Sequence, residues 1–118
     1  MTEANRRDNA RNEAALGDDA LRAADALLGL GLPNDAVSRA YYAAFHYARA
    51  LLLTVGLEPK THRGVVDLVV EHFERPGRLA PEIASALARL QTFRGLADYD
   101  ARHRYVRSRS TPRWRFRT

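Results

Sequence analysis

Apolar residues recur at helical spacing along almost the whole chain, and glycine or proline separates the periodic segments. No segment alternates apolar and polar residues as a strand does. The breaks predict helices at about residues 3–30, 34–55, 63–74 and 81–97, with Gly56 at the end of the second and Thr61 as the N-cap of the third. Four amphipathic helices joined by short links predict an all-α fold, an antiparallel four-helix bundle.

The length and composition fit one compact domain. The chain has 118 residues, 46% of them hydrophobic, which is too short for two ordinary domains. It has no cysteine, so disulfides, thiolate zinc sites and cysteine nucleophiles are excluded. Its strongest apolar run, residues 50–55, is far shorter than the roughly 20 residues that span a bilayer. We therefore expect a soluble, cytoplasmic protein without membrane contact.

The net charge of +5 is concentrated at the C-terminus. Residues 101–118 hold seven arginines and no acidic residue, whereas residues 1–100 hold 12 basic and 14 acidic residues. This contrast predicts a bundle domain at 1–100 and a basic, disordered tail at 101–118. The tail either binds nucleic acid or serves as a solvated, solubilising segment. Its candidate contacts for phosphates and bases are Arg102, Arg104, Arg113, Trp114 and Arg115.

A polar strip runs beside the apolar face of the second predicted helix. At 100° per residue, its four members fall within an arc of about 80°. They combine a hydroxyl, a phenol, an imidazole and a guanidinium: Ser38, Tyr42, His46 and Arg49. One interpretation is a groove that binds a nucleotide or RNA. The other is a half-buried flank whose polar tips reach water or a neighbouring helix.

Arg94 falls on the apolar stripe of the fourth predicted helix, between the directions of Leu87 and Leu90. Burying an unpaired guanidinium is prohibitively costly, so this side chain must be paired or must face a polar site. Asp98, four residues later, is the partner nearest in sequence. The alternatives are a subunit interface and an anion-binding groove.

Other site chemistries find little support. A di-iron bundle needs Glu-x-x-His on two helices, whereas the nearest match is a single Asp100-x-x-His103. The sequence has no glycine-rich phosphate loop, and no serine lies at a strand-to-helix elbow. His72 falls on the core side of the third predicted helix, where a structural role is expected. We therefore expect no metal and no cofactor.

Three blocks together resemble small prokaryotic HEPN-domain proteins. They are Ser38-Arg39-Ala40-Tyr41-Tyr42-Ala43-Ala44-Phe45-His46, Thr61-His62-x-Gly64-Val65 and Arg94-Gly95-Leu96-Ala97-Asp98-Tyr99. The resemblance covers about residues 10–100 and implies a helical bundle that is often dimeric. It also implies a minimal nucleotidyltransferase as partner, in a toxin–antitoxin or defence module. Active members of the family are metal-independent ribonucleases.

The resemblance implies a degenerate catalytic motif. The family pattern is an arginine, four to six residues, and a histidine that is often followed by x-Tyr. Arg94 matches the arginine, but Tyr99 stands where the histidine would follow the shortest spacer, as in a distinct Arg-x-x-Ala-Asp-Tyr branch. The candidate catalytic residues are thus Arg94, Asp98 and Tyr99. Tyrosine, with a reference pKa of about 10, is a poor base at neutral pH.

Two functions remain open from the sequence. The first is an RNA-directed toxin, enzymatic or degenerate, and the second is a non-catalytic adaptor that binds a nucleotide or a nucleotidyltransferase. Relatives typically continue with another amphipathic helix where this chain has its arginine-rich segment. Without that further helix, the four predicted helices leave part of their apolar surface exposed, which favours self-association. We therefore expect a homodimer with the fourth helices near its two-fold axis.

Overall fold

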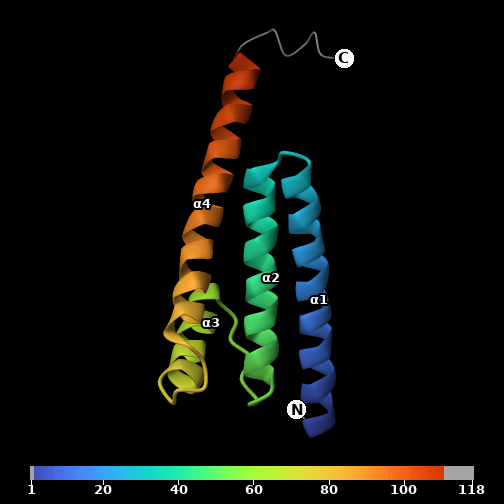
Figure 1. The fold of residues 1–118 in the computed structure, drawn as a ribbon, viewed down its shortest axis with the longest axis vertical. Coiled ribbons are helices and arrows are strands. Elements are labelled where there is room, and N and C mark those ends of the chain that lie inside the picture. The colour runs from blue at the N-terminus through green and yellow to red at the C-terminus, as the bar shows by residue number, and fades with distance from the viewer. Residues whose placement is uncertain (1, 111–118) are drawn as a thin grey trace.

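The computed structural model describes residues 2–110, with side chains described as far as residue 96. Its helices are α1 (Glu3–Gly29), α2 (Pro33–Leu53), α3 (His62–Val69) and α4 (Pro81–Ser110), and a π-helical turn, Val70–Glu74, continues α3. The described part contains no strand, which confirms the predicted all-α class. Figure 1 shows α1 and α2 as an antiparallel hairpin, with α4 along the other side of α2.

Helix α2 occupies the centre of the fold. It contacts α1, α3 and α4, whereas α1 contacts only α2 among the described helices. Thr61 caps α3 as predicted, because its side chain accepts a hydrogen bond from the Gly64 amide at 2.9 Å. Gly56 takes the left-handed conformation after α2, with φ of +80°. The left-handed Gly56 and the Thr61 N-cap thus define where the chain leaves α2 and where α3 begins.

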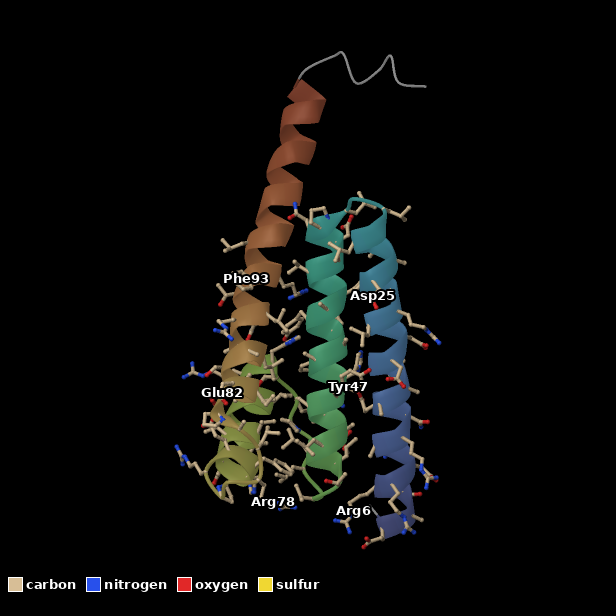
Figure 2. The ribbon with its side chains drawn as sticks, viewed as in Figure 1. Arg6, Asp25, Tyr47, Arg78, Glu82 and Phe93 are labelled. Carbon is tan, nitrogen blue, oxygen red and sulfur yellow. The ribbon has the colours of Figure 1, made fainter. Side chains whose placement is uncertain are left out.

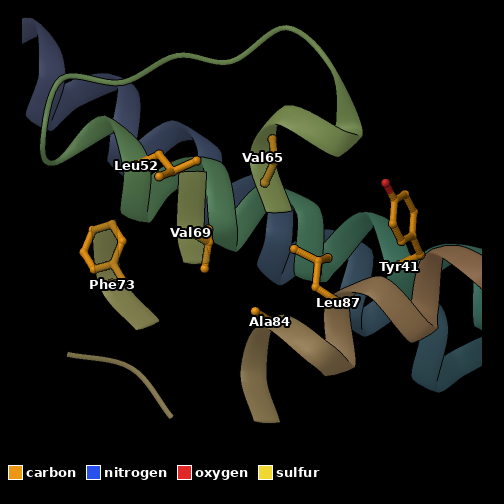
Figure 3. Close-up of a cluster of buried hydrophobic side chains, with 7 residues drawn as sticks. All are labelled: Tyr41, Leu52, Val65, Val69, Phe73, Ala84 and Leu87. Atoms are coloured by element: carbon orange, nitrogen blue, oxygen red, sulfur yellow. The ribbon is translucent and has the colours of Figure 1, made fainter. Parts of the chain in front are cut away.

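The main core lies where α2, α3 and α4 meet (Figure 3). Its buried side chains come from all three helices and the π-helical turn: Tyr41, Leu52, Val65, Val69, Phe73, Ala84 and Leu87. His72, expected on the core side, is instead 41% exposed. The π-helical turn explains this correction, since its wider spacing aligns Phe73 rather than His72 with Val69.

Small residues form the contact between α1 and α2. The buried residues of α1 are Gly17, Ala20 and Ala24. The helical spacing of this segment predicts a core stripe of Leu16, Ala20, Ala23, Leu27 and Leu30; Ala20 is buried and Ala23 and Leu27 are half-buried, but Leu16 and Leu30 are 49% and 74% exposed. Tyr47 of α2 extends toward α1 (Figure 2), and its hydroxyl donates to Asp18 at 2.5 Å. The contact with α2 therefore uses the small residues of the predicted stripe and excludes its terminal leucines.

Substituting Gly17 tests this close approach. A Cβ there would lie 2.7 Å from Cε1 of Tyr47, so the ring must move and strain its bond to Asp18. Gly95→Ala is a matched control, because a Cβ at Gly95 meets nothing within 4 Å and alanine gains helix propensity. We expect Gly17→Ala to be about 1–3 kcal/mol less stable than Gly95→Ala in urea unfolding. Equal stabilities would contradict the packing described.

Helix α4 is longer than predicted. The expected end near residue 97 is wrong, because the helix continues to Ser110 and its final turns extend beyond the α1–α2 turn (Figure 1). The first ten residues of the expected disordered tail are therefore helical. Residues 111–118 lie outside the described part. No helix in the described part is both long and apolar enough to cross a membrane.

Candidate functional site

Arg94 packs against two tyrosines of α2. Its Nη2 donates a hydrogen bond to the Tyr42 hydroxyl at 2.9 Å. Its Cζ lies 5.0 Å from the centroid of the Tyr42 ring and 5.4 Å from that of Tyr41, within the range of cation–π attraction. The half-buried guanidinium is therefore held by aromatic faces and a phenol.

A pocket of about 430 Å³ lies beside this contact. It is lined from α1, α2 and α4 by Leu27, Asp35, Ser38, Arg39, Tyr42 and Arg94. The Arg39 Cζ lies 5.1 Å from the Tyr42 ring centroid, so two guanidiniums approach the same ring. With Asp35 as the one acidic lining residue, the pocket carries a formal charge of +1. This arrangement suits a phosphate group next to a planar base.

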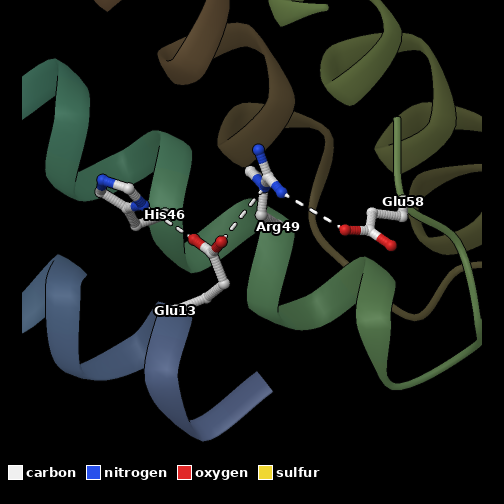
Figure 4. A network of polar contacts seen from close by, with 4 residues as sticks. All are labelled: Glu13, His46, Arg49 and Glu58. Atoms are coloured by element: carbon white, nitrogen blue, oxygen red, sulfur yellow. Dashed lines mark hydrogen bonds and ion pairs between the residues drawn. The ribbon is translucent and has the colours of Figure 1, made fainter. Parts of the chain in front are cut away.

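The predicted polar strip is divided in the structure. Ser38 and Tyr42 line the pocket with Arg94, whereas His46 and Arg49 face Glu13 of α1 (Figure 4). Glu13 Oε2 lies 2.7 Å from His46 Nδ1, and Oε1 lies 3.4 Å from Arg49 Nε.

Arg49 also reaches the loop between α2 and α3, where its Nη2 lies 3.9 Å from Glu58 Oε1. His46 lines a second pocket of about 280 Å³ that also includes Arg39 and Tyr42. The imidazole of His46 thus lies near the first pocket, while its Nδ1 is engaged by Glu13. Arg49 instead links α1, α2 and the following loop.

The structure adds His62 to the surroundings of Arg94. This first residue of α3 is hydrogen-bonded through Nδ1 to the Tyr41 hydroxyl, and its ring stacks on Phe45 with centroids 4.4 Å apart. Burial, and then the Arg94 charge, lower the pKa of His62. Burial also raises the pKa of Tyr41, so this phenol stays protonated at neutral pH.

His62, Arg39 and Asp35 were not among the candidate site residues predicted from the sequence. The block Thr61-His62-x-Gly64-Val65 was the available signal for His62, but its contact with α2 depends on the loop between the helices. Arg39 lies one residue after Ser38, outside the arc of the polar strip. Its approach to Tyr42 depends on the reach of its long side chain.

The remaining candidate residues cannot be placed against the pocket. Asp98, Tyr99, Arg102 and Arg104 belong to α4 beyond the described side chains. Arg113, Trp114 and Arg115 lie outside the described residues altogether. Over the part of the chain that is described, no group of three or more histidine, aspartate or glutamate side chains could hold a metal ion.

Comparison with known families identifies the class of protein. The family model of the HEPN domain matches residues 16–113, so the chain belongs to the HEPN family. The match starts within α1 and extends past the end of α4. It therefore includes most of the arginine-rich segment that was expected to lie outside the domain. No solved structure matches the chain significantly.

Several curated proteins are similar in sequence. The chain is 39% identical over 84 residues to "Putative toxin MJ0605" of Methanocaldococcus jannaschii, covering 71% of this chain and 63% of the relative. It is 40% identical over 82 residues to the UPF0332 protein glr0978 of Gloeobacter violaceus, covering 70% and 65%. A second M. jannaschii protein, "Putative toxin MJ0142", is 34% identical over 84 residues, covering 71% and 57%. The matched region spans less than two thirds of these relatives.

Proposed function

We propose that this HEPN protein is an RNA-directed toxin whose bundle binds RNA at the Arg94 pocket. The observation that carries the proposal is the convergence of Arg94 and Arg39 on Tyr42, beside a pocket that Ser38 also lines. Two relatives that carry toxin names support the biological role. The proposed site of action is the cytoplasm.

The chemistry of the pocket favours a nucleotide phosphate over a simple carboxylate ligand. Each guanidinium offers several N–H donors in a planar fork, which matches phosphate oxygens. The half-buried Tyr42 ring supplies an aromatic surface on which a base stacks, and such stacking is worth about 1–3 kcal/mol per base. One site can thus hold two adjacent parts of a nucleotide.

The proposed partner is a minimal nucleotidyltransferase that acts as the antitoxin. The support for it is the resemblance of the three sequence blocks to HEPN proteins encoded beside such enzymes. The same pocket also suits the second candidate function, an adaptor that binds a nucleotide or the nucleotidyltransferase without chemistry. An RNA assay separates the two, because an adaptor leaves RNA untouched.

Induced expression with and without a candidate minimal nucleotidyltransferase partner tests the proposal. We expect expression alone to arrest growth and change the profile of cellular RNA, and co-expression to restore both. Purified protein should also retain a labelled single-stranded RNA in a filter-binding assay. Normal growth, an intact RNA profile and no RNA binding would reject the toxin, whereas nucleotide binding with intact RNA would favour the adaptor.

We also propose a homodimer formed through α4. Ile83, Phe93 and Leu96 of this helix are 52%, 53% and 60% exposed, and an apolar pocket of about 280 Å³ between α2 and α4 includes Leu79 and Leu90. Large exposed apolar side chains on one helix favour self-association. We expect sedimentation of a dimer at tens of micromolar and of a monomer for Phe93→Glu. A wild-type monomer at that concentration would contradict the proposal.

A further inference from the structure

We propose that the Arg94 pocket binds guanine in preference to the other bases of RNA, and that Asp35 determines this preference. The inference rests on the proposed function and names the nucleotide that the pocket takes. Its starting point is the mixed charge of the lining, since Arg39 and Arg94 attract a phosphate whereas the carboxylate of Asp35 repels one. A ligand that uses the whole lining therefore carries an anionic group and, close to it, a group of hydrogen-bond donors.

The carboxylate of Asp35 is not paired with either arginine of the pocket. Among the residues whose side chains are described, none forms an ion pair with Asp35, although Arg39 lies four residues later on the same helix. The guanidiniums of Arg39 and Arg94 lie instead against the ring of Tyr42, with Cζ 5.1 Å and 5.0 Å from its centroid. Asp35 is exposed, so its oxygens are accessible to a ligand in the pocket.

Helix α2 places Asp35 on the same face as the other residues that it contributes to the pocket. Ser38, Arg39 and Tyr42 follow Asp35 at spacings of three, four and seven residues. The rise from Asp35 to Tyr42 is about 10 Å, and helical side chains lean toward the N-terminus, so the Tyr42 ring inclines toward Asp35. The remaining distance suits a purine that stacks on Tyr42 and presents its edge to the carboxylate.

Guanine is the base whose edge matches a carboxylate. Its N1–H and its N2 amino group are adjacent donors, and the two oxygens of Asp35 can accept both hydrogen bonds at once. Adenine presents the lone pair of N1 at the corresponding position, which a carboxylate repels. Cytosine offers only its N4 amino group, and uracil only N3–H between two carbonyls. With the phosphate at the arginines, guanine therefore satisfies both charges of the pocket.

Asp35 also has a structural role that the test must separate from recognition. It lies in the first turn of α2, where a carboxylate interacts favourably with the helix dipole whether or not a ligand is bound. Loss of this interaction lowers the stability of the protein but leaves the choice between bases unchanged. Base preference is therefore the readout that distinguishes the two roles.

The test uses full-length protein and labelled pentauridylates that carry guanine, adenine or xanthine at the central position. Anisotropy at about 200 mM salt measures their binding while contacts with the RNA backbone are screened. The wild type should bind the guanine oligonucleotide at least about fivefold more tightly than the adenine one, the lower bound for one bidentate contact. Asp35→Asn should lose this preference and bind xanthine at least about fivefold more tightly than guanine, because an amide pairs its N–H with O2 and its carbonyl with N1–H of xanthine.

Asp25→Asn is the matched control, because it removes the same charge from an exposed position on α1 that does not line the pocket. It should keep the wild-type preference. If Asp35→Asn fails to fold, Asp35→Ser is the second variant, since serine is also suited to the start of a helix. It should lose the guanine preference without gaining one for xanthine.

Equal binding of guanine and adenine by the wild type would overturn the inference, while the RNA binding of the proposed function would stand. A guanine preference that persists in the folded Asp35 variants would overturn the role of Asp35. If the wild type binds none of the three oligonucleotides, the proposed function fails together with the inference.

Discussion

Arg94→Ala should lower the affinity for single-stranded RNA by about 10- to 100-fold. A charged hydrogen-bonding group contributes about 1.5–3 kcal/mol, and Arg94 provides such a group at the edge of the pocket. Arg94→Lys should also weaken binding, because lysine keeps the charge but lacks the planar fork. Fluorescence anisotropy with a labelled oligonucleotide measures both losses.

Arg89→Ala is the matched control for Arg94. It removes the same charge from an exposed position on the same helix, one that does not line the pocket. Its affinity should stay within about twofold of the wild type. Circular dichroism must show that the Arg94 variants remain folded. Unchanged affinity in a folded Arg94→Ala protein would remove Arg94 from the site, and loss of folding would show that its contacts with the tyrosines are structural.

Replacing the seven arginines of residues 101–118 with glutamine should abolish most of the salt dependence of RNA binding. If every one of them meets a phosphate, the wild-type slope of log K against log salt approaches about −5, since each contact contributes roughly −0.7. The remaining residues carry a net charge of −2, so the variant should bind weakly and with a shallow slope. The variant keeps the length of the chain, so dimerisation can be checked on the same protein.

A salt series between 50 mM and 500 mM distinguishes the two interpretations of this segment. Contacts with phosphates predict a steep slope for the wild type and a shallow one for the glutamine variant. If the segment only aids solubility, the wild type and the glutamine variant should have the same RNA affinity and the same slope of log K against log salt. That result would rule out a nucleic-acid role for residues 101–118. If the glutamine variant loses RNA binding but still dimerises, the electrostatic contribution of residues 101–118 is distinguished from the contribution of the bundle.

Local sequence signals predicted the helices well but their contact faces less well. Thr61, Gly56 and the proline breaks act within a few residues, so the sequence locates the helix ends near them. The α1 face was predicted only in part: Ala20 of the predicted stripe is buried, but Leu16 and Leu30 are exposed, because Gly17 and its small neighbours permit the close approach of α2. Helix packing thus overrode the apolar pattern.

The end of α4 was mispredicted for a different reason. Charge density was taken as a signal of disorder, yet arginine and alanine are strong helix formers, and no proline follows Pro81 until Pro112. The residue before a proline is biased away from the helical conformation, which agrees with the end of α4 at Ser110. Helix propensity therefore outweighed the missing apolar stripe.

The sequence identified Arg94 but not all of its surroundings. A charge on an apolar stripe demands a partner, and this argument needs only the fourth helix. Its described partners are Tyr41 and Tyr42, more than 50 residues earlier in the chain, whereas the side chain of Asp98, the partner nearest in sequence, lies outside the described residues. His62 was missed because its contact with Tyr41 joins two helices across a loop. Such contacts depend on the tertiary structure.

The most direct test of RNA binding at the Arg94 pocket is an NMR titration of ¹⁵N-labelled protein with a short single-stranded RNA. We predict that the largest amide shifts fall at residues 35–42 of α2 and around residue 94, and that the Arg94 Nε–H resonance moves with them. The same titration of Arg94→Lys should lose the shifts at residues 35–42. Shifts confined to residues beyond 100, with the pocket unaffected, would contradict the account.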